Sequence, residues 1–157
     1  PIIFNDTLFN NVTFFEEKND ENLKKFYDSI KKSHLLEFVN KLADKEDTIL
    51  ANNGINLSGG QRQRISIARE LYKDSDFLFM DEATSALDSE TENFIQKNIE
   101  KMKGIKTLVI AAHRLSTIKE ADRIIIMDNG SIHAIGTFNE LMKNNAMFKK
   151  MIEMQKF

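Results

Sequence analysis

The sequence predicts an α/β fold with a helical subdomain at its N-terminal end. Apolar residues recur at helical spacing in the segments between residues 19 and 71. Two short runs of continuous apolar residues follow, at 77–80 and 107–111, with a helical segment between them, which is typical of an α/β layer. We therefore expect a helical subdomain of about residues 1–72 and the C-terminal part of an α/β core of about residues 73–157.

The N-terminal segment is predicted to form three helices. The first is capped by Asn19 and Asp20, and its apolar face consists of Leu23, Phe26, Tyr27 and Ile30. The second carries Leu35, Leu36, Val39 and Leu42. Residues 51–54 are polar and contain a glycine, which predicts a loop. Ser58 is a natural N-cap for the third helix, which turns inward Ile65, Ala68 and Leu71.

The two apolar runs, at 77–80 and 107–111, are predicted to be strands buried on both faces of a parallel sheet. Ser89 and Glu92 have the spacing of a capping box, so the helix between the strands is expected to begin at about Ser89.

The C-terminal segment is predicted to contain a hairpin and short helices. A short helix at about 117–121 leads to a strand at 124–127. Residues 128–130 are Asp-Asn-Gly, a hairpin turn signal, because Asn and Gly tolerate positive φ. The closing elements are a return strand at 132–135, a short helix capped by Thr137 and Glu140, and a last helix from about Ala146.

Composition narrows the function classes. The chain has 157 residues, enough for one compact domain, and its formal net charge of −2 gives no general attraction to nucleic acid or acidic lipid. It has no cysteine, which excludes a disulfide framework, thiol catalysis and a zinc–thiolate site. Its longest apolar runs are too short to span a bilayer, and no signal-peptide pattern is visible.

Two adjacent carboxylates, Asp81 and Glu82, follow the first predicted strand. Ligand sites in open α/β sheets lie at the carboxyl ends of strands. One carboxylate there can hold Mg²⁺ through water, and the second can orient or deprotonate an attacking water. The alternative is a helix N-terminus decorated with acidic residues, which favour that end of the helix dipole.

Ser58, Gly59, Gly60 and Gln61 open the third predicted helix. Two glycines at a helix start leave backbone N–H groups uncovered, and the helix dipole favours an anion there. An ordinary capped helix does not call for both glycines, since each weakens the first turn by about 1 kcal/mol relative to alanine. The pattern therefore favours a phosphate-binding surface.

His113 follows the second predicted strand, where it could reach the same phosphate as the two carboxylates. His34 and His133 have no such setting, so we interpret them as structural or exposed to solvent.

Together these segments resemble the ATPase domain of ABC transporters. Residues 57–64, Leu-Ser-Gly-Gly-Gln-Arg-Gln-Arg, are similar to the family's signature motif. Other segments resemble further motifs of the family, in the family's order and over essentially the whole chain. Residues 77–82 resemble Walker B, residues 83–88 the D-loop and residues 112–117 the switch-histidine segment. Residues 4–7 resemble the stretch after the Q-loop, and residues 128–138 resemble the closing hairpin. The amino-acid sequences of these motifs are most similar to those of bacterial exporters, although Asn52 stands where exporters often carry a glutamate.

The resemblance implies a partial P-loop NTPase (RecA-like) core and a set of residue roles. It implies that Asp81 assists Mg²⁺, that Glu82 polarises the attacking water and that His113 senses the γ-phosphate of ATP. Ser58, Gly59, Gly60 and Gln61 would contact the nucleotide of an opposite subunit in a head-to-tail dimer, and Asp88 would lie at the subunit junction. A transmembrane domain fused upstream would place the complete protein at the cytoplasmic face of the inner membrane, with no nucleic-acid partner.

The sequence contains no P-loop, because none of its glycines, at 54, 59, 60, 104, 130 and 136, is followed by lysine. The chain also begins with Pro1, as if inside a strand or loop. We therefore expect a C-terminal fragment that is inactive alone and self-associates through exposed strand edges or apolar surface.

Two other functions remain open at this stage. One is a soluble ABC-type ATPase of DNA repair or chromosome organisation, although the long coiled-coil or zinc insertions usual there are not seen. The other is a non-catalytic module that offers its signature face to a complete partner.

Overall fold

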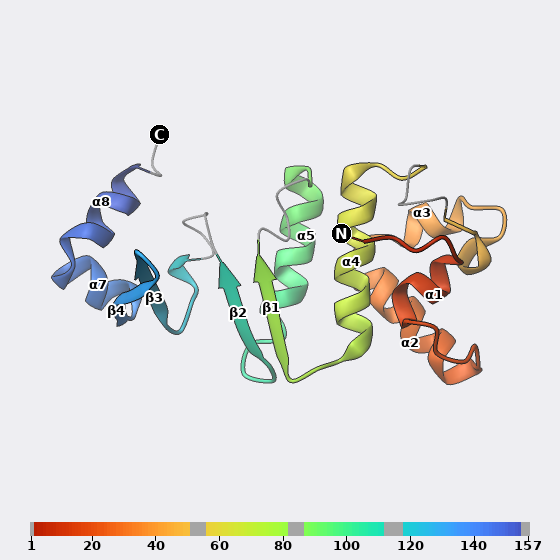
Figure 1. Ribbon diagram of the computed structural model, residues 1–157, viewed down its shortest axis with the longest axis horizontal. Helices are drawn as coiled ribbons and strands as arrows, with labels where there is room; N and C mark the ends of the chain where they lie inside the picture. Colours follow the sequence, from red (N-terminus) through yellow and green to blue (C-terminus); the bar gives the residue numbers. More distant parts are fainter. Residues whose placement is uncertain (1, 51–55, 82–86, 112–117, 155–157) are drawn as a thin grey trace. The chain divides into compact units, whose positions relative to one another are not determined.

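The computed structural model describes residues 2–50, 56–81, 87–111 and 118–154, and its contacts divide the chain into two compact units, Pro1–Val109 and Ile110–Phe157 (Figure 1). The predicted loop at 51–54 lies outside the described residues. Within the described ranges, no helix combines the length and the apolar character that crossing a membrane requires.

The first unit begins with a helical layer built around one long helix. Its elements are α1 (Leu8–Thr13), α2 (Asp20–Lys32), α3 (Leu36–Asn40), a 3-10 helix η1 (Lys45–Asp47) and α4 (Gly59–Lys73). The predicted cap of α2 is confirmed, since the Asn19 side chain accepts a hydrogen bond of 2.9 Å from the Asn22 amide. The predicted inward face of α4 is also confirmed, because Ile65 and Ala68 are fully buried and Leu71 packs, partly buried, against a second cluster.

The core of this layer lies where α1 and α2 pack against α4. Its fully buried apolar members include Leu8, Val12, Phe26, Ile30, Leu35 and Val39, joined by Tyr72 near the end of α4. Burial of each such side chain contributes about 1.5–3 kcal/mol. The helical layer therefore has a core made from its own residues.

A two-stranded sheet follows, formed by β1 (Phe77–Asp81) and β2 (Thr107–Ala111). The arrows of the two strands point the same way in Figure 1, and α5 (Ser89–Glu100) forms the connection between them. Helices α4 and α5 supply Ile67, Ile95 and Ile99 to a cluster that also receives Met80 from β1 and Leu108 from β2. The predicted strand–helix–strand order is therefore confirmed.

The prediction that both strands are buried on both faces was wrong. Phe77 is 59% exposed and Phe79 is 73% exposed, whereas Leu78 between them is buried. In β2, Val109 is exposed as well. Successive side chains of a strand point to opposite faces, and α4 and α5 cover one face of the sheet in this unit. A continuous apolar run cannot report whether a second covering layer is present.

The predicted capping box of Ser89 and Glu92 was also wrong. Asp88, one residue earlier, is the N-cap of α5. Its carboxylate accepts a hydrogen bond of 2.9 Å from the Thr91 amide and one of 2.8 Å from the Thr91 hydroxyl. Asp88 has the extended backbone of an N-cap, with φ −68° and ψ 157°, and its two oxygens serve both donors of Thr91.

The second unit is a hairpin packed on two helices. Strands β3 (Ile124–Asp128) and β4 (Ser131–Gly136) pair antiparallel, and Asn129 and Gly130 take the positive φ values that the turn signal predicted. Thr137 and Glu140 form the predicted capping box of α7 (Phe138–Asn144), which α8 (Ala146–Met154) follows. The buried residues are Ile126, Leu141, Phe148 and Ile152. Of the short helix predicted at 117–121, Ile118 and Lys119 are helical, and Thr117 lies outside the described residues.

Candidate functional site

The first turn of α4 is a helix N-terminus held by a reciprocal cap. The Ser58 hydroxyl accepts from the Gln61 amide at 3.1 Å, and the Gln61 side chain accepts from the Ser58 amide at 2.8 Å. The first bond between turns of the helix runs from the Arg62 amide to the Ser58 carbonyl, at 3.0 Å. The amides of Gly59 and Gly60 precede that bond, so the helix itself offers them no carbonyl one turn back.

The space around Gly59 at this N-terminus is open. Gly59 is exposed, and a Cβ atom added there would meet nothing within 4 Å. The first amides of a helix lie at the positive end of its dipole, and an anion could approach at Gly59, where the space is open. The geometry of Ser58, Gly59 and Gly60 therefore suits a phosphate group.

Two arginines brace this turn from behind. The Arg62 guanidinium donates to the Leu57 carbonyl at 2.6 Å. The Arg64 guanidinium donates to the His34 carbonyl at 2.7 Å and, through Nε, to the Gly60 carbonyl at 3.4 Å. Burial lowers the pKa of Arg64, and the negative charge of Asp88 acts in the opposite direction. Sequence reasoning missed Arg64 as a bracing residue, because its partner His34 lies thirty residues away in the chain.

Asp88 lies at the start of α5 and interacts electrostatically with Arg64 of α4. Its pKa lies below the ordinary value because the Thr91 amide and hydroxyl donate to the carboxylate, with Arg64 acting in the same direction. The carboxylate is therefore ionised and held in one orientation near neutral pH. Its exposed position leaves the carboxylate accessible while it caps the helix.

Asp81 ends β1 at the same end of the first unit as the start of α4. Figure 1 shows that the chain turns back after α4, so the C-terminal end of β1 and the N-terminal ends of α4 and α5 lie at the same end. Asp81 is exposed there. Glu82 and His113, the other two predicted chemical residues, lie outside the described residues.

Arg69 fastens α4 to the N-terminal segment. Its Nε donates to the Asn11 carbonyl at 2.8 Å, and its Nη2 donates to the Ile2 carbonyl at 3.0 Å. The guanidinium also lies over the rings of Phe4 and Phe14. Arg69 is buried, and this burial lowers its pKa. Nothing in the sequence spacing pointed to this anchor, since its partners lie more than fifty residues away in the chain.

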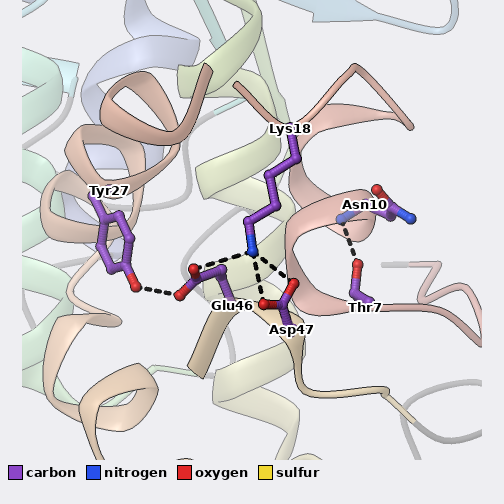
Figure 2. Close-up of polar contacts among 6 residues, drawn as sticks. All are labelled: Thr7, Asn10, Lys18, Tyr27, Glu46 and Asp47. Atoms are coloured by element: carbon purple, nitrogen blue, oxygen red, sulfur yellow. Dashed lines mark hydrogen bonds and ion pairs between the residues drawn. The ribbon is translucent and has the colours of Figure 1, made fainter. Parts of the chain in front are cut away.

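An ion-paired cluster holds η1, which precedes the signature turn (Ser58–Gln61) in the chain (Figure 2). The Lys18 amine pairs with Glu46 at 3.2 Å and with Asp47 at 2.7 Å. The Tyr27 hydroxyl on α2 donates to the Glu46 carboxylate, and burial together with this bond raises the pKa of Tyr27 to about 12. The cluster therefore ties η1 to α2 and to the loop before α2.

Comparisons with known proteins found similar sequences and a similar fold. The sequence profile of the ABC transporter family matches residues 2–85. The chain is 42% identical over 153 residues to the ATP-dependent lipid A-core flippase of Pasteurella multocida, and 43% identical over 156 residues to that of Pseudoalteromonas translucida. Each alignment covers 98% of this chain and 26% of the relative, so the chain spans about a quarter of the length of these curated relatives.

A solved structure shares the fold. It is described as a bacterial Atm1-family ABC exporter with ATP bound, and it matches with a TM-score of 0.88 at 31% sequence identity. The match covers 99% of this chain and 27% of the exporter chain.

Proposed function

This chain belongs to the ABC transporter family, and we propose that it forms the signature-bearing part of an ATPase subunit that drives export of a substrate across a membrane. The relatives named as ATP-dependent flippases, and the exporter that matches in structure, favour this function over a soluble ATPase of DNA repair. The proposal concerns the complete protein, of which the chain supplies one face of the nucleotide site.

The observation that carries the proposal is the open N-terminus of α4. Its capping box engages Ser58 and Gln61, and the amides of Gly59 and Gly60 precede the first bond between turns of the helix, so they can donate to a terminal phosphate. We propose that Ser58, Gly59, Gly60 and Gln61 contact the γ-phosphate of an ATP molecule held by the opposite subunit of a head-to-tail dimer. The Gln61 side chain is engaged in the cap, so the backbone of the turn would provide most of its contribution.

The carboxylates supply the chemistry in this proposal. Asp81 would assist Mg²⁺ through water, Glu82 would polarise the attacking water, and His113 would sense the γ-phosphate. Within the described ranges no group of three acidic or histidine side chains gathers that could hold a metal alone. A single exposed carboxylate acting through water fits a hydrated Mg²⁺ that also binds phosphate oxygens. Asp88, held as the cap of α5, would lie at the junction of the two subunits.

The proposed partners follow from the site. A second ATPase subunit completes each nucleotide site, and a transmembrane domain fused upstream receives the mechanical work. The complete protein would then act at the cytoplasmic face of the inner membrane, with ATP and Mg²⁺ as its cofactors and no nucleic-acid partner.

Substitution of the proposed base tests the function. In the complete protein, Glu82→Gln should lower kcat by about 10²–10⁴-fold while ATP binding is retained, because the amide keeps the shape but cannot accept the proton. Glu90→Gln, at an exposed position in the first turn of α5, is the control and should keep parental turnover. ATPase assays and nucleotide-binding titrations decide between these outcomes. Parental turnover in Glu82→Gln would show that another group activates the water.

The same assay applies to the 157-residue chain by itself. We propose that it has no measurable ATPase activity and weak affinity for ATP, because its sequence contains no P-loop to supply the main phosphate contacts. Hydrolysis by the purified chain that disappears in Glu82→Gln would contradict this part of the proposal.

A further inference from the structure

The turn between α2 and α3 carries one residue, His34, that contacts both helices of the candidate site. Its backbone carbonyl accepts the 2.7 Å hydrogen bond from Arg64 of α4. Its imidazole ring stacks on the ring of Phe94 of α5, with centroids 4.5 Å apart and planes inclined by 26°. His34 therefore links the N-terminal halves of α4 and α5 through a third structural element.

Each contact leads directly to a residue of the candidate site. Arg64 also donates to the Gly60 carbonyl, so the His34 carbonyl and the signature turn share one guanidinium. Phe94 lies in the second turn of α5, the helix that Asp88 caps. A displacement of the turn at His34 would therefore move the first turns of both α4 and α5.

We propose that His34 is a positioning residue that holds the first turns of α4 and α5 in one arrangement and so sets the separation between the Gly59–Gly60 amides and the Asp88 carboxylate. The consequence for ATP hydrolysis rests on the function proposed above. The structural part of the proposal, a fixed separation of the two helix starts, does not.

The backbone conformation of His34 supports a role for its ring. Its φ of 59° places it in the left-handed region, where a helix ends most readily with glycine or asparagine. Neither of those residues has a ring to place on Phe94. Histidine is among the non-glycine residues that tolerate this region, and so it combines the turn with an aromatic contact.

The surroundings indicate stacking rather than hydrogen bonding as the role of the imidazole. Its Nδ1 atom is buried and has no hydrogen-bond partner in the described part of the chain. A buried polar atom without a partner is a cost, whereas the stacked contact of the ring with Phe94 is favourable.

A second contact shows why the ring matters for α5. The Asn98 side chain, one turn after Phe94, donates to the Lys32 carbonyl at the end of α2, at 3.0 Å. Asn98 ties α5 to α2 by one hydrogen bond, and Ile95 and Ile99 pack α5 against α4. The stack of His34 on Phe94 adds a contact between α5 and the turn before α3, close to the start of α5.

Distance measurements between spin labels test the proposal on the 157-residue chain. The sequence has no cysteine, so labels can be attached at Gly59→Cys and Glu90→Cys without removing a native thiol. A side chain fits at Gly59, and Glu90 is exposed. The parent should give a narrow distance distribution, and His34→Asn, which keeps the left-handed turn but loses the ring, should broaden it.

Three further variants make the outcome decisive. Phe94→Leu removes the other half of the stack and should broaden the distribution as His34→Asn does, whereas His34→Tyr restores a ring and should narrow it again. Phe15→Asn is the matched control, because Phe15 also has a left-handed backbone (φ 66°) and this variant loses a ring that contacts Phe4 instead of Phe94. An unchanged width in His34→Asn, or equal broadening in Phe15→Asn, would overturn the proposal.

A kinetic measurement on the complete ATPase tests the consequence for hydrolysis. His34→Asn should lower kcat roughly tenfold, since small misplacements of catalytic groups are costly, while KM for ATP changes by less than about twofold. His34→Tyr should recover most of the lost rate. Parental kcat in His34→Asn would overturn the catalytic consequence. A complete protein without ATPase activity would instead overturn the proposed function and leave the distance measurement to decide the role of His34.

Discussion

The helical layer and the two-stranded sheet of the first unit bury their apolar residues to different extents. In the layer around α4, side chains such as Phe26 and Ile65 are fully buried among residues of the same layer. In the sheet, Phe77 and Phe79 alternate with buried Leu78 and remain exposed. A helix needs a partner along one stripe only, whereas an apolar strand needs a layer on each face.

The helical layer therefore covers its apolar side chains with its own residues, whereas the sheet leaves apolar side chains exposed on one face. Large exposed side chains gathered on one face commonly mark a surface that another element or molecule covers. The start of α4 lies in the well-packed layer, and Ile95 and Ile99 of α5 pack against Ile67 of α4.

A matched pair of truncations should show the largest effect of this difference. Phe26→Ala should lower the free energy of unfolding by roughly 3–5 kcal/mol, because it opens a cavity in a fully buried position. Phe79→Ala removes the same atoms from an exposed position and should change it by less than about 0.5 kcal/mol. Urea unfolding of the 157-residue chain measures both, and Phe26→Leu provides a milder variant if Phe26→Ala does not fold.

Sedimentation of the same variants sharpens the comparison. If the chain self-associates through the exposed face of β1, Phe79→Ala should weaken the association while Phe26→Leu leaves it unchanged. A cost for Phe79→Ala as large as that for Phe26→Ala, with a monomer at every concentration, would contradict the exposed position of Phe79.

The helical layer could be predicted well from the sequence because its signals are local. The periodicity of Phe26 and Ile30 and the caps at Asn19 and Ser58 lie within a few residues of what they determine. The exposure of Phe79 could not be predicted, since it depends on which layers pack on the sheet. Composition alone cannot distinguish a strand covered on one face from a strand covered on two.

The N-cap of α5 was predicted one residue away from its true position. Asp88→Ala should lower Tm by roughly 2–4 °C, whereas Ser89→Ala should leave it nearly unchanged, because Asp88 and not Ser89 accepts the hydrogen bonds of Thr91. Thermal melts followed by circular dichroism measure the difference. Equal shifts for the two variants would mean that either side chain can serve as the cap.

The candidate site was predictable where the chemistry resides and not where its support resides. Ser58, Gly59 and Gly60 are adjacent in the sequence, so their pattern is visible without the fold, and so is the position of Asp81 after an apolar run. The bond of Arg64 to the His34 carbonyl, the bond of Arg69 to the Asn11 carbonyl and the stack of His34 on Phe94 each join residues thirty or more positions apart. Such contacts follow from packing, and no spacing rule identifies them. The roles of all the candidate residues, Glu82 and His113 among them, stay predictions.

The smallest expected effect concerns the cluster that ties η1 to α2. Tyr27→Phe should lower the free energy of unfolding by about 1 kcal/mol at neutral pH, because it removes the hydrogen bond to Glu46. Burial and Glu46 raise the pKa of Tyr27 to about 12 in the folded chain, against about 10 in an unfolded one. A raised pKa means that the contribution of Tyr27 is fully present below about pH 10 and is lost as the pH rises through about 12.

The difference in unfolding free energy between the parent and Tyr27→Phe, measured by urea unfolding across this pH range, should therefore be constant from pH 7 to about pH 10 and shrink above it. The pKa of Tyr72, the other tyrosine, is also raised, by burial and by its bond to Glu16. Its titration contributes equally to both proteins and cancels in the difference. Glu46→Gln is the control, because without the carboxylate Tyr27→Phe should show a smaller and less pH-dependent effect. A difference that stays constant to the highest pH would show that the Tyr27–Glu46 bond does not hold η1 against α2, and the anchoring would then rest on the ion pairs of Lys18.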